Sequence, residues 1–334
     1  MTTPTRKRAK KKQQTTRREL LRDGVITTGL VAATLAGGAL MYGEQPVRRR
    51  EKPILTLPNY RPEPSTHTRE LAIIHGQDVE KMVRDALQAM GGLGRFVQKG
   101  ERVLLKPNVG WDRFPEQAAN TGPELVKAVA QLCREAGAAK VVVSDFSLND
   151  PQRCFVRSGI EKAAQEAGAE LHLPSKSDFV MTQMGGEVLG DWLAMRTLHE
   201  VDRVINLPIV KHHSLSGCTL SMKNHYGIIG GRRNRLHQNI HTSIVDLAAA
   251  VRPTLTIMDA TRVLKRNGPT GGNVADVALE ETIIAATDEV ALDAYCTRFL
   301  DLTPEDVPFL AMAEARGLGT TNWKNLRWLE RSIL

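Results

Sequence analysis

The side chains of this chain that are best suited to chemistry are concentrated between Val204 and His241. Five of the nine histidines fall in this stretch, and two lysines, Lys211 and Lys223, lie among them. The rest of the stretch is rich in leucine, isoleucine, valine and glycine, so composition does not explain the polar cluster. We therefore expect it to form the wall of an active or binding site. The five histidines are His212, His213, His225, His237 and His241.

Two pieces of this stretch combine a lysine with histidine. Lys211 precedes two histidines, and because adjacent side chains of an extended chain point to opposite sides, we expect one of them, His213, to face the site. Lys223 precedes Asn224 and His225. Imidazole suits proton transfer near neutral pH, so His213 and His225 are candidate acids or bases. Lys211 and Asn224 are candidate ligand-binding residues, and Lys223 is a candidate electrostatic stabiliser or covalent cofactor anchor.

Residues 227–233 have the sequence GIIGGRR, which could place several backbone N–H groups around an anion. Gly230, Gly231 and Arg232 would then bind a carboxylate or phosphate. A simple turn is the alternative reading of these glycines.

His237 and His241 are four residues apart, the spacing that puts two ligands on one face of a helix. They are candidate metal ligands. Two surface histidines would have the same spacing.

Short β-branched runs alternate with helical stripes from about residue 69 onward. This order is typical of βαβ units, and it predicts one α/β domain over residues 69–334: a mostly parallel sheet with helices on both faces, a three-layer sandwich. Two α/β lobes divided near residues 174–200, where the pattern is hard to read, are the alternative. The expected strands cover 71–74, 102–106, 140–145, 170–173, 203–207, 254–259 and 282–287, and the expected helices cover 79–90, 121–136, 152–167, 243–251, 290–300 and 309–316.

Polar residues stand where several of these strands end. Ligands of open parallel sheets bind outside the carboxyl ends of the strands, so we expect Lys106, Asn108, Asp145 and Asp259 to line the site. The two aspartates could instead cap the next helix or turn. Lys106 has no such role, and its charge needs a partner at the end of a buried strand.

Net charge excludes a nucleic-acid groove in the body of the protein. The chain carries a formal charge of +8, but residues 1–24 hold nine basic and two acidic residues, and residues 53–334 hold 32 basic and 33 acidic residues. The four cysteines are scattered without a C-x-x-C pair, so an iron–sulfur cluster held by this chain alone is not expected. One or two disulfide bonds are the alternative if the protein is exported.

The first 43 residues resemble a twin-arginine export signal. Arg17 and Arg18 precede two apolar residues and Arg22, and an uncharged run from Val25 to Tyr42 follows. The resemblance implies transport by the twin-arginine machinery to the periplasm or the outer face of the cytoplasmic membrane. A membrane anchor behind a basic tail is the alternative. Residues 44–68 contain five prolines and predict an extended linker.

Four segments together resemble the domain of unknown function 362 family. The motifs are Lys-Pro-Asn, then Asn-Leu-Pro-x-x-Lys-x-His, then Met-Lys-Asn-x-x-Gly, and the resemblance covers the chain from about residue 70 onward. Some members of that family carry extra cysteine clusters for iron–sulfur centres, which this chain lacks. The segments are VLLKPNVG (103–110), AGAAKVVVSD (136–145), VDRVINLPIVKHHSLSGCTLSMKNHYGIIGGR (201–232) and DEVALDAYCTRFL (288–300).

A smaller resemblance links the central stretch to the nickel-pincer lactate racemase family. His213, Gly217 and Lys223 keep the spacing of a histidine, a glycine and a cofactor-bearing lysine in one loop of that family. The flanking Ser-Gly-Gly-Arg is replaced by residues 219–222, TLSM. The resemblance implies a metal-containing cofactor on Lys223.

Two functions follow as expectations. The first is an exported enzyme, an oxidoreductase or a racemase or isomerase, that uses a metal or cofactor and acts on a small anionic molecule. The second is a non-catalytic protein that binds a metal or cofactor, or helps to assemble a redox complex.

Overall fold

The computed structural model describes residues 16–41, 53–63 and 67–334, which fall into two units, residues 1–52 and 53–334. The first unit contains helix α1 (Arg17–Met41), which begins at the predicted arginine pair. No helix in the described ranges has the length and apolarity that crossing a membrane requires. The end of the predicted signal at residues 42–43 and linker residues 44–52 and 64–66 lie outside the described residues.

A large, mostly parallel sheet forms the centre of the second unit. Its strands run in the order β13-β2-β12-β11-β8-β3-β4-β5, and every neighbouring pair is parallel except the two that β12 makes with β2 and β11. The strands are β2 (Leu71–His75), β3 (Arg102–Pro107), β4 (Lys140–Val143), β5 (Glu170–Leu171), β8 (Arg203–Leu207), β11 (Leu255–Leu264), β12 (Val277–Ala286) and β13 (Trp328–Ser332).

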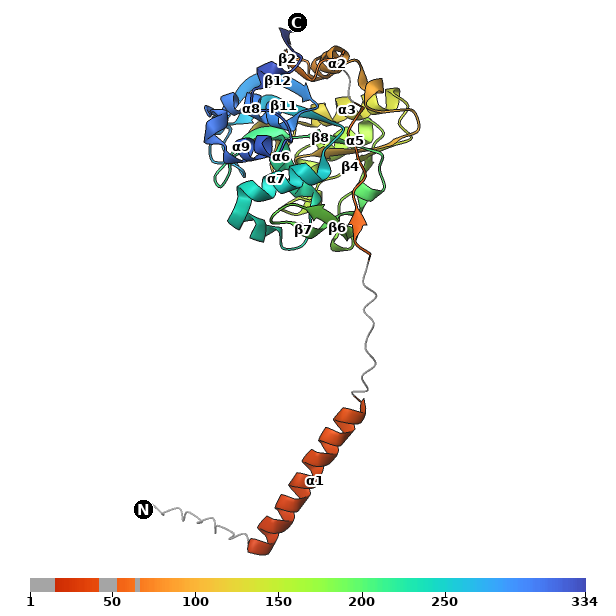
Figure 1. Cartoon of the computed structure of the whole chain (residues 1–334), viewed down its shortest axis with the longest axis vertical. Helices are drawn as coiled ribbons and strands as arrows, with labels where there is room; N and C mark the ends of the chain where they lie inside the picture. Colours follow the sequence, from red (N-terminus) through yellow and green to blue (C-terminus); the bar gives the residue numbers. More distant parts are fainter. Residues whose placement is uncertain (1–15, 42–52, 64–66) are drawn as a thin grey trace, which may run out of the picture. The chain divides into compact units, whose positions relative to one another are not determined.

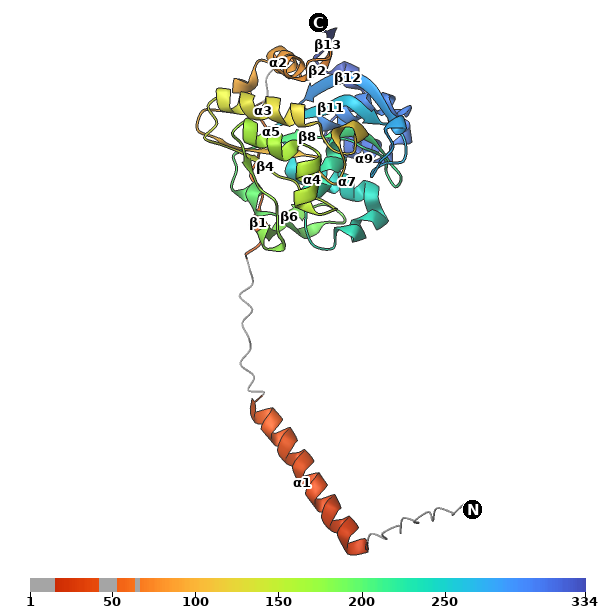
Figure 2. The same cartoon turned by 180° about the vertical axis from the view of Figure 1, so that it is seen from behind.

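Helices cover both faces of this sheet, which confirms the predicted three-layer sandwich. Figure 1 shows α6 (Ser221–Asn224), α7 (Ile240–Val251), α8 (Glu289–Cys296) and α9 (Pro308–Ala315) on one face. Figure 2 shows α2 (Val79–Ala89), α3 (Pro123–Glu135), α4 (Pro151–Arg157) and α5 (Ile160–Glu166) on the other.

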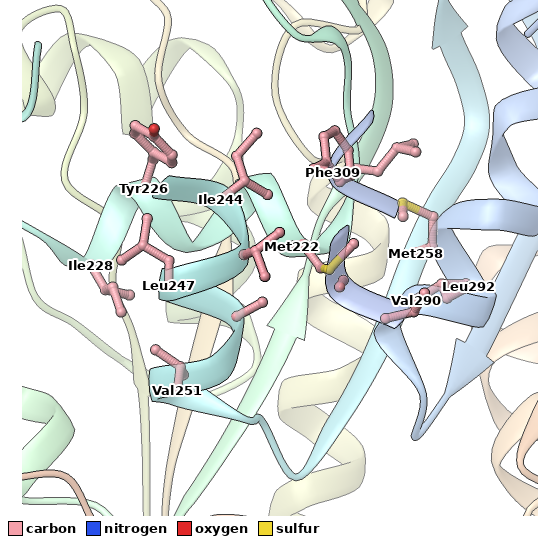
Figure 3. Close-up of a cluster of buried hydrophobic side chains, with 14 of the residues drawn as sticks. Met222, Tyr226, Ile228, Ile244, Leu247, Val251, Met258, Val290, Leu292 and Phe309 are labelled. Carbon is pink, nitrogen blue, oxygen red and sulfur yellow. The ribbon is translucent and has the colours of Figure 1, made fainter. Parts of the chain in front are cut away.

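Successive residues of a strand place their side chains in the two hydrophobic layers alternately, because side chains alternate between the two faces of a sheet. In β3, Leu104 packs with α7 and α8, whereas Leu105 packs with α2 and α3. Figure 3 shows the first layer, where Ile244 and Leu247 of α7 meet Met222 of α6 and Phe309 of α9. This layer fixes α6, and with it the lysine that follows Met222.

Residues 174–200, which were hard to read from the sequence, form a hairpin of β6 (Phe179–Gly185) and β7 (Gly190–Met195). A short strand, β1 (Leu55–Thr56), pairs with β6 and completes a three-stranded sheet. Nearby Tyr60 is fully buried and donates a hydrogen bond to the Leu198 carbonyl at 2.5 Å. Part of the predicted linker is therefore integral to the folded unit, which begins before residue 69.

Two local predictions were wrong. The expected helix 152–167 is two helices, because Gly159 (φ 76°) breaks it between α4 and α5. Thr121 does not cap α3, whose N-cap is Gly122. The Thr121 hydroxyl instead accepts from the Asn108 N–H at 2.8 Å and donates to the Leu207 carbonyl at 2.7 Å, which ties the ends of β3 and β8 together.

Candidate active site

A cavity of about 310 Å³ opens where β3, β4 and β8 end. After β8 the chain continues into β9 (Ile209–His213) and β10 (Gly217–Thr219), a hairpin beside β11, and then into α6. Segments far apart in the sequence therefore converge on one crevice, as expected at the carboxyl edge of a parallel sheet. Its polar lining includes Asn108, Asp145, Lys211, His213, Thr219, Lys223, Asn224, Arg233 and His237.

The innermost ion pair joins Lys106 at the end of β3 to Asp145 just after β4. The Lys106 ammonium is fully buried and donates to Asp145 Oδ1 at 2.7 Å and to Asn224 Oδ1 at 3.2 Å. Asp145 Oδ2 accepts from the Val109 N–H at 2.7 Å. Burial lowers the pKa of Lys106, and Asp145 opposes that shift. This pair supplies the partner that a buried lysine needs.

Gly227 is the residue that lets the backbone reach this pair. A Cβ at position 227 would lie 1.7 Å from Asp145 Oδ1 and 2.7 Å from Lys106 Nζ. No side chain fits there, so glycine is required by close approach rather than by its φ angle.

Lys211 of β9 is buried against neutral acceptors. Its ammonium donates to Asn108 Oδ1 at 2.8 Å and to the Ala119 carbonyl at 2.5 Å, and 1% of the residue is exposed. Burial, together with repulsion from Lys223, lowers the pKa of Lys211 to about 7. Lys211 therefore exchanges its proton near neutral pH.

Lys223 of α6 faces the cavity without a hydrogen-bond acceptor in the described part of the chain. α6 is held in place because Asp293 accepts from the Ser221 N–H at 2.7 Å and the Met222 N–H at 3.1 Å. The Lys223 ammonium lies over the Tyr226 ring, 4.6 Å from its centroid. Burial lowers the pKa of Lys223 to about 8. Its N–H donors remain available to a ligand.

His213 is a neutral imidazole in this setting. Burial and the charges of Lys223 and Lys211 lower its pKa to about 2. Its Nδ1 accepts from the Leu215 N–H at 3.1 Å, which assigns the proton to Nε2. His213 can therefore donate one hydrogen bond without carrying charge.

Arg233, the last residue of the predicted anion-binding loop 227–233, supplies a third basic side chain to the cavity. Its guanidinium donates to the carbonyls of Phe146 at 2.9 Å and Ser147 at 3.1 Å, and lies over the Phe146 ring at 4.6 Å. Its neighbour Arg232, the predicted anion ligand, is exposed and does not line the cavity. Which of two adjacent arginines faces inward depends on the turn that precedes them, and the sequence does not specify that turn.

A one-directional chain of amides connects the cavity to a buried carboxylate. Lys211 donates to Asn108, whose Nδ2 donates to Asn224 Oδ1 at 2.9 Å. Asn224 Nδ2 donates to Asn206 Oδ1 at 2.8 Å, and Asn206 Nδ2 donates to Glu289 Oε1 at 2.8 Å. An ammonium only donates and a carboxylate only accepts, so the two ends fix the orientation of all three amides.

His225, a predicted catalytic residue, lies at the far end of this chain and does not line the cavity. It is fully buried, and its Nε2 lies 2.9 Å from Glu289 Oε2. Burial alone would raise the pKa of Glu289, but attraction to His225 and the bonds from His225, Asn206 and Thr256 lower it. The structure therefore places His225 outside the cavity lining, where it pairs with Glu289.

Three other predicted ligand residues serve the fold. Asp259 lies inside β11, not at its end, and accepts from the Gly122 N–H at 2.7 Å, while burial raises its pKa. Gly230 packs under Phe179, whose ring would lie 2.7 Å from a Cβ there, and its N–H donates to the Leu193 carbonyl. Gly231 (φ 67°) turns the chain beside them. Gly230 and Gly231 contact the β6–β7 region and are not part of the cavity lining.

His237 and His241 do not share an α-helical face. His237 lies in a 3₁₀ segment (Arg233–Asn239) and stacks on Tyr226 at the cavity, whereas His241 lies in α7 and stacks on Phe309. Over residues 16–41, 53–63 and 67–334, no group of three or more His, Cys, Asp or Glu side chains is placed to hold a metal ion. All four cysteines are buried and free.

The sequence matches one family model and one curated relative. The model of the family described as Domain of unknown function (DUF362) matches residues 103–298. A thylakoid-associated protein of Synechocystis sp. is 32% identical over 254 residues, which cover 72% of this chain and 75% of the relative.

Two solved structures match part of this chain with low sequence identity and low TM-scores. The lactate racemase apoprotein from Thermoanaerobacterium thermosaccharolyticum matches with a TM-score of 0.39 and 13% identity, over 74% of this chain and 61% of the racemase. A Thermotoga maritima protein matches with a TM-score of 0.37 and 10% identity, over 72% of this chain and 60% of that chain. Both matches span less than two thirds of the solved chain. The family match and the Synechocystis relative establish that this chain belongs to the domain of unknown function 362 family.

Proposed function

We propose that this chain is an enzyme that binds a small anionic molecule in the cavity and transfers a proton to or from it. The observation that carries the proposal is the Lys223 ammonium, which has no hydrogen-bond acceptor among the described residues and faces the cavity beside Lys211 and Arg233. The carboxylate among the lining residues, Asp145, is already bonded to Lys106. A buried charge is expensive to leave unpaired, so an anionic ligand complements this arrangement.

The lysines suit two different roles in such a reaction. Neutral Lys211 has two N–H groups, and its two acceptors, Asn108 and the Ala119 carbonyl, can use both. Its lone pair is then free to accept a substrate proton, and a pKa of about 7 is near the optimum for a general base at neutral pH. Lys223 and Arg233 hold the anion and stabilise the charge that develops on it. His213 donates a further hydrogen bond from Nε2.

A bare divalent cation does not fit these residues. Among the described residues that line the cavity, three basic side chains, Lys211, Lys223 and Arg233, stand against one carboxylate, which is bound to Lys106. A cofactor that binds here would therefore itself be anionic, with Lys223 and Arg233 as its partners. The charge of the lining residues therefore favours the first expected function, a racemase, isomerase or oxidoreductase acting on a small anion, over a site for a free metal ion.

Binding of oxalate, a small dianion, tests the proposal. Isothermal titration of the full chain at pH 6.5 should detect binding, and Lys223→Met should weaken it ~10- to 150-fold, the equivalent of one charge-assisted hydrogen bond. Methionine keeps the length of the side chain and removes the buried charge, so the variant should fold. Lys176→Met removes an exposed lysine and serves as the matched control. Equal affinities for all three chains would refute the proposed anion site.

The location of the protein is proposed separately. The Synechocystis relative is named as thylakoid-associated, and this chain carries a twin-arginine resemblance at Arg17 and Arg18. We propose export by the twin-arginine machinery followed by association with a membrane. Fractionation of an export-competent bacterium tests this: Arg17→Lys with Arg18→Lys should keep the protein in the cytoplasm, and unchanged export would contradict the proposal.

A further inference from the structure

The cavity is lined by apolar side chains as well as by the basic side chains Lys211, Lys223 and Arg233. The chain contains only four tryptophans, seven phenylalanines and four tyrosines, and one of each lines this cavity: Trp111, Phe146 and Tyr226. Leu148, Leu215 and Pro269 complete the apolar part of the lining. An aromatic-poor protein therefore places a set of aromatic and aliphatic side chains around a group of cations.

Two of these apolar side chains are largely exposed to solvent. Leu148 is 59% exposed and Leu215 is 58% exposed, although both belong to the cavity lining. They come from different loops, one after β4 and one between β9 and β10. A ligand that covers these two leucines would be bound more tightly. Each Å² of apolar surface removed from water stabilises the complex by about 25 cal/mol.

Trp111 is the aromatic residue whose ring face is not occupied by one of the cavity cations. Lys223 lies over Tyr226 and Arg233 lies over Phe146, each at 4.6 Å. The backbone of Trp111 is held on both sides by buried Asn120, which accepts from its N–H at 3.1 Å and donates to its carbonyl at 2.8 Å. This clamp fixes the base of the indole side chain and leaves its ring beside the cavity.

We infer that the natural ligand is a carboxylate carried on an apolar group, aryl or alkyl. This rests on the proposed anion site. The carboxylate binds Lys223 and Arg233, and the apolar group packs against Trp111, Leu148 and Leu215. A cavity of about 310 Å³ lies within the range of about 300–1,000 Å³ found for sites that enclose drug-sized ligands. It therefore exceeds the needs of a two-carbon acid.

Three probes separate this inference from the proposed function. Acetate and phenylacetate present the same carboxylate, and phenylacetate adds a phenyl ring; oxalate presents charge alone. In calorimetric titrations of the full chain at pH 6.5, phenylacetate should bind at least tenfold more tightly than acetate. If oxalate binds but phenylacetate binds no more tightly than acetate, the inference is wrong and the anion site stands. If none of the three binds, the anion site itself is refuted.

Substitutions of the apolar lining residues test whether those side chains contact the phenyl ring. Trp111→Ala should weaken phenylacetate ~2- to 13-fold, the range expected for one lost aromatic contact, and leave acetate unchanged. Leu215→Ser, at an exposed position on another loop, should also weaken phenylacetate selectively. Phe114→Ala is the matched control, because Phe114 is 56% exposed in the Trp111 loop but does not line the cavity. Equal losses for acetate and phenylacetate in both wall variants would overturn the inference.

Discussion

Oxalate affinity should fall as the pH rises through the range in which Lys211 and Lys223 lose their protons. Their pKa values, about 7 and about 8, lie below the usual 10.5 because burial disfavours the charged form. A bound anion favours the ammonium, so binding takes up protons wherever the free site is deprotonated. Affinity is therefore greatest below pH 7, where both lysines are already charged, and it declines above that pH.

The size of the decline follows from the two values. Between pH 7 and pH 9 the requirement for a charged Lys223 lowers the affinity about 10-fold. If Lys211 must be charged as well, the combined loss is about 500-fold. The measured ratio thus reports whether one lysine or both contact the probe. Oxalate remains a dianion throughout this range, so its own ionisation does not contribute.

Calorimetric titration at pH 6, 7, 8 and 9, in buffers of different ionisation enthalpy, measures both the affinity and the number of protons taken up. Lys223→Met should remove the step near pH 8, and Lys176→Met should retain it. Affinity that is independent of pH between 7 and 9, with no proton uptake, would refute the conclusion that these lysines titrate in the free site and contact the ligand.

The unfolding free energy of the ligand-free protein should rise over the same pH range in which the affinity for oxalate falls. Between the folded pKa values near 7 and 8 and the unfolded value of 10.5, the unfolded chain binds more protons than the folded chain. Each lysine therefore adds about 1.4 kcal/mol of unfolding free energy per pH unit in that window. Urea denaturation at pH 7 and pH 9, compared between the wild type and Lys223→Met, isolates this contribution from other alkaline effects.

Three substitutions probe the surroundings of the site. Gly227→Ala should disrupt the Lys106–Asp145 pair and lower both stability and oxalate affinity, whereas Gly94→Ala, where a Cβ meets nothing within 4 Å, should leave oxalate affinity unchanged; equal affinities would contradict the close approach. Asp145→Asn leaves Lys106 buried without a counter-charge and should cost ~3–5 kcal/mol of unfolding free energy at neutral pH, measured in urea. Glu289→Gln removes a charged acceptor and should cost ~1.5–3 kcal/mol. Because the folded pKa of Glu289 is depressed, that difference should disappear as the pH falls through its titration, and a constant difference down to pH 3 would exclude this explanation.

The layer architecture and the general position of the site were predictable, because they follow from local patterns. Alternating strand and helix signals predicted the sheet, and the rule that ligands bind at carboxyl strand ends placed Lys106 and Asp145 at one edge. The structure confirms this sheet, and it brings Lys211, His213 and Lys223 to the same cavity.

The details that failed depend on contacts between distant segments. The sequence around His225 is typical of a site residue, but in the structure the buried His225 side chain pairs with Glu289. Asp259 ends the predicted strand, yet β11 continues past it, because pairing with β12 extends as far as Leu264. The need for glycine at position 227 comes from Asp145, more than eighty residues earlier in the chain, and no local pattern carries that information.

The position of β2 in the sheet has a consequence for synthesis. Its neighbours are β12 (Val277–Ala286) and β13 (Trp328–Ser332), so the first long strand of the unit pairs only with segments near its end. As the chain leaves the ribosome, one edge of residues 71–75 stays unpaired until β12 has emerged, and the other edge stays unpaired until β13 has emerged. β2 is apolar and buried on both faces, so a nascent or truncated chain exposes an aggregation-prone edge. Synthesis of β13 is therefore needed before the sheet can close at β2, and chains cut before β13 should be recognised by chaperones and proteases.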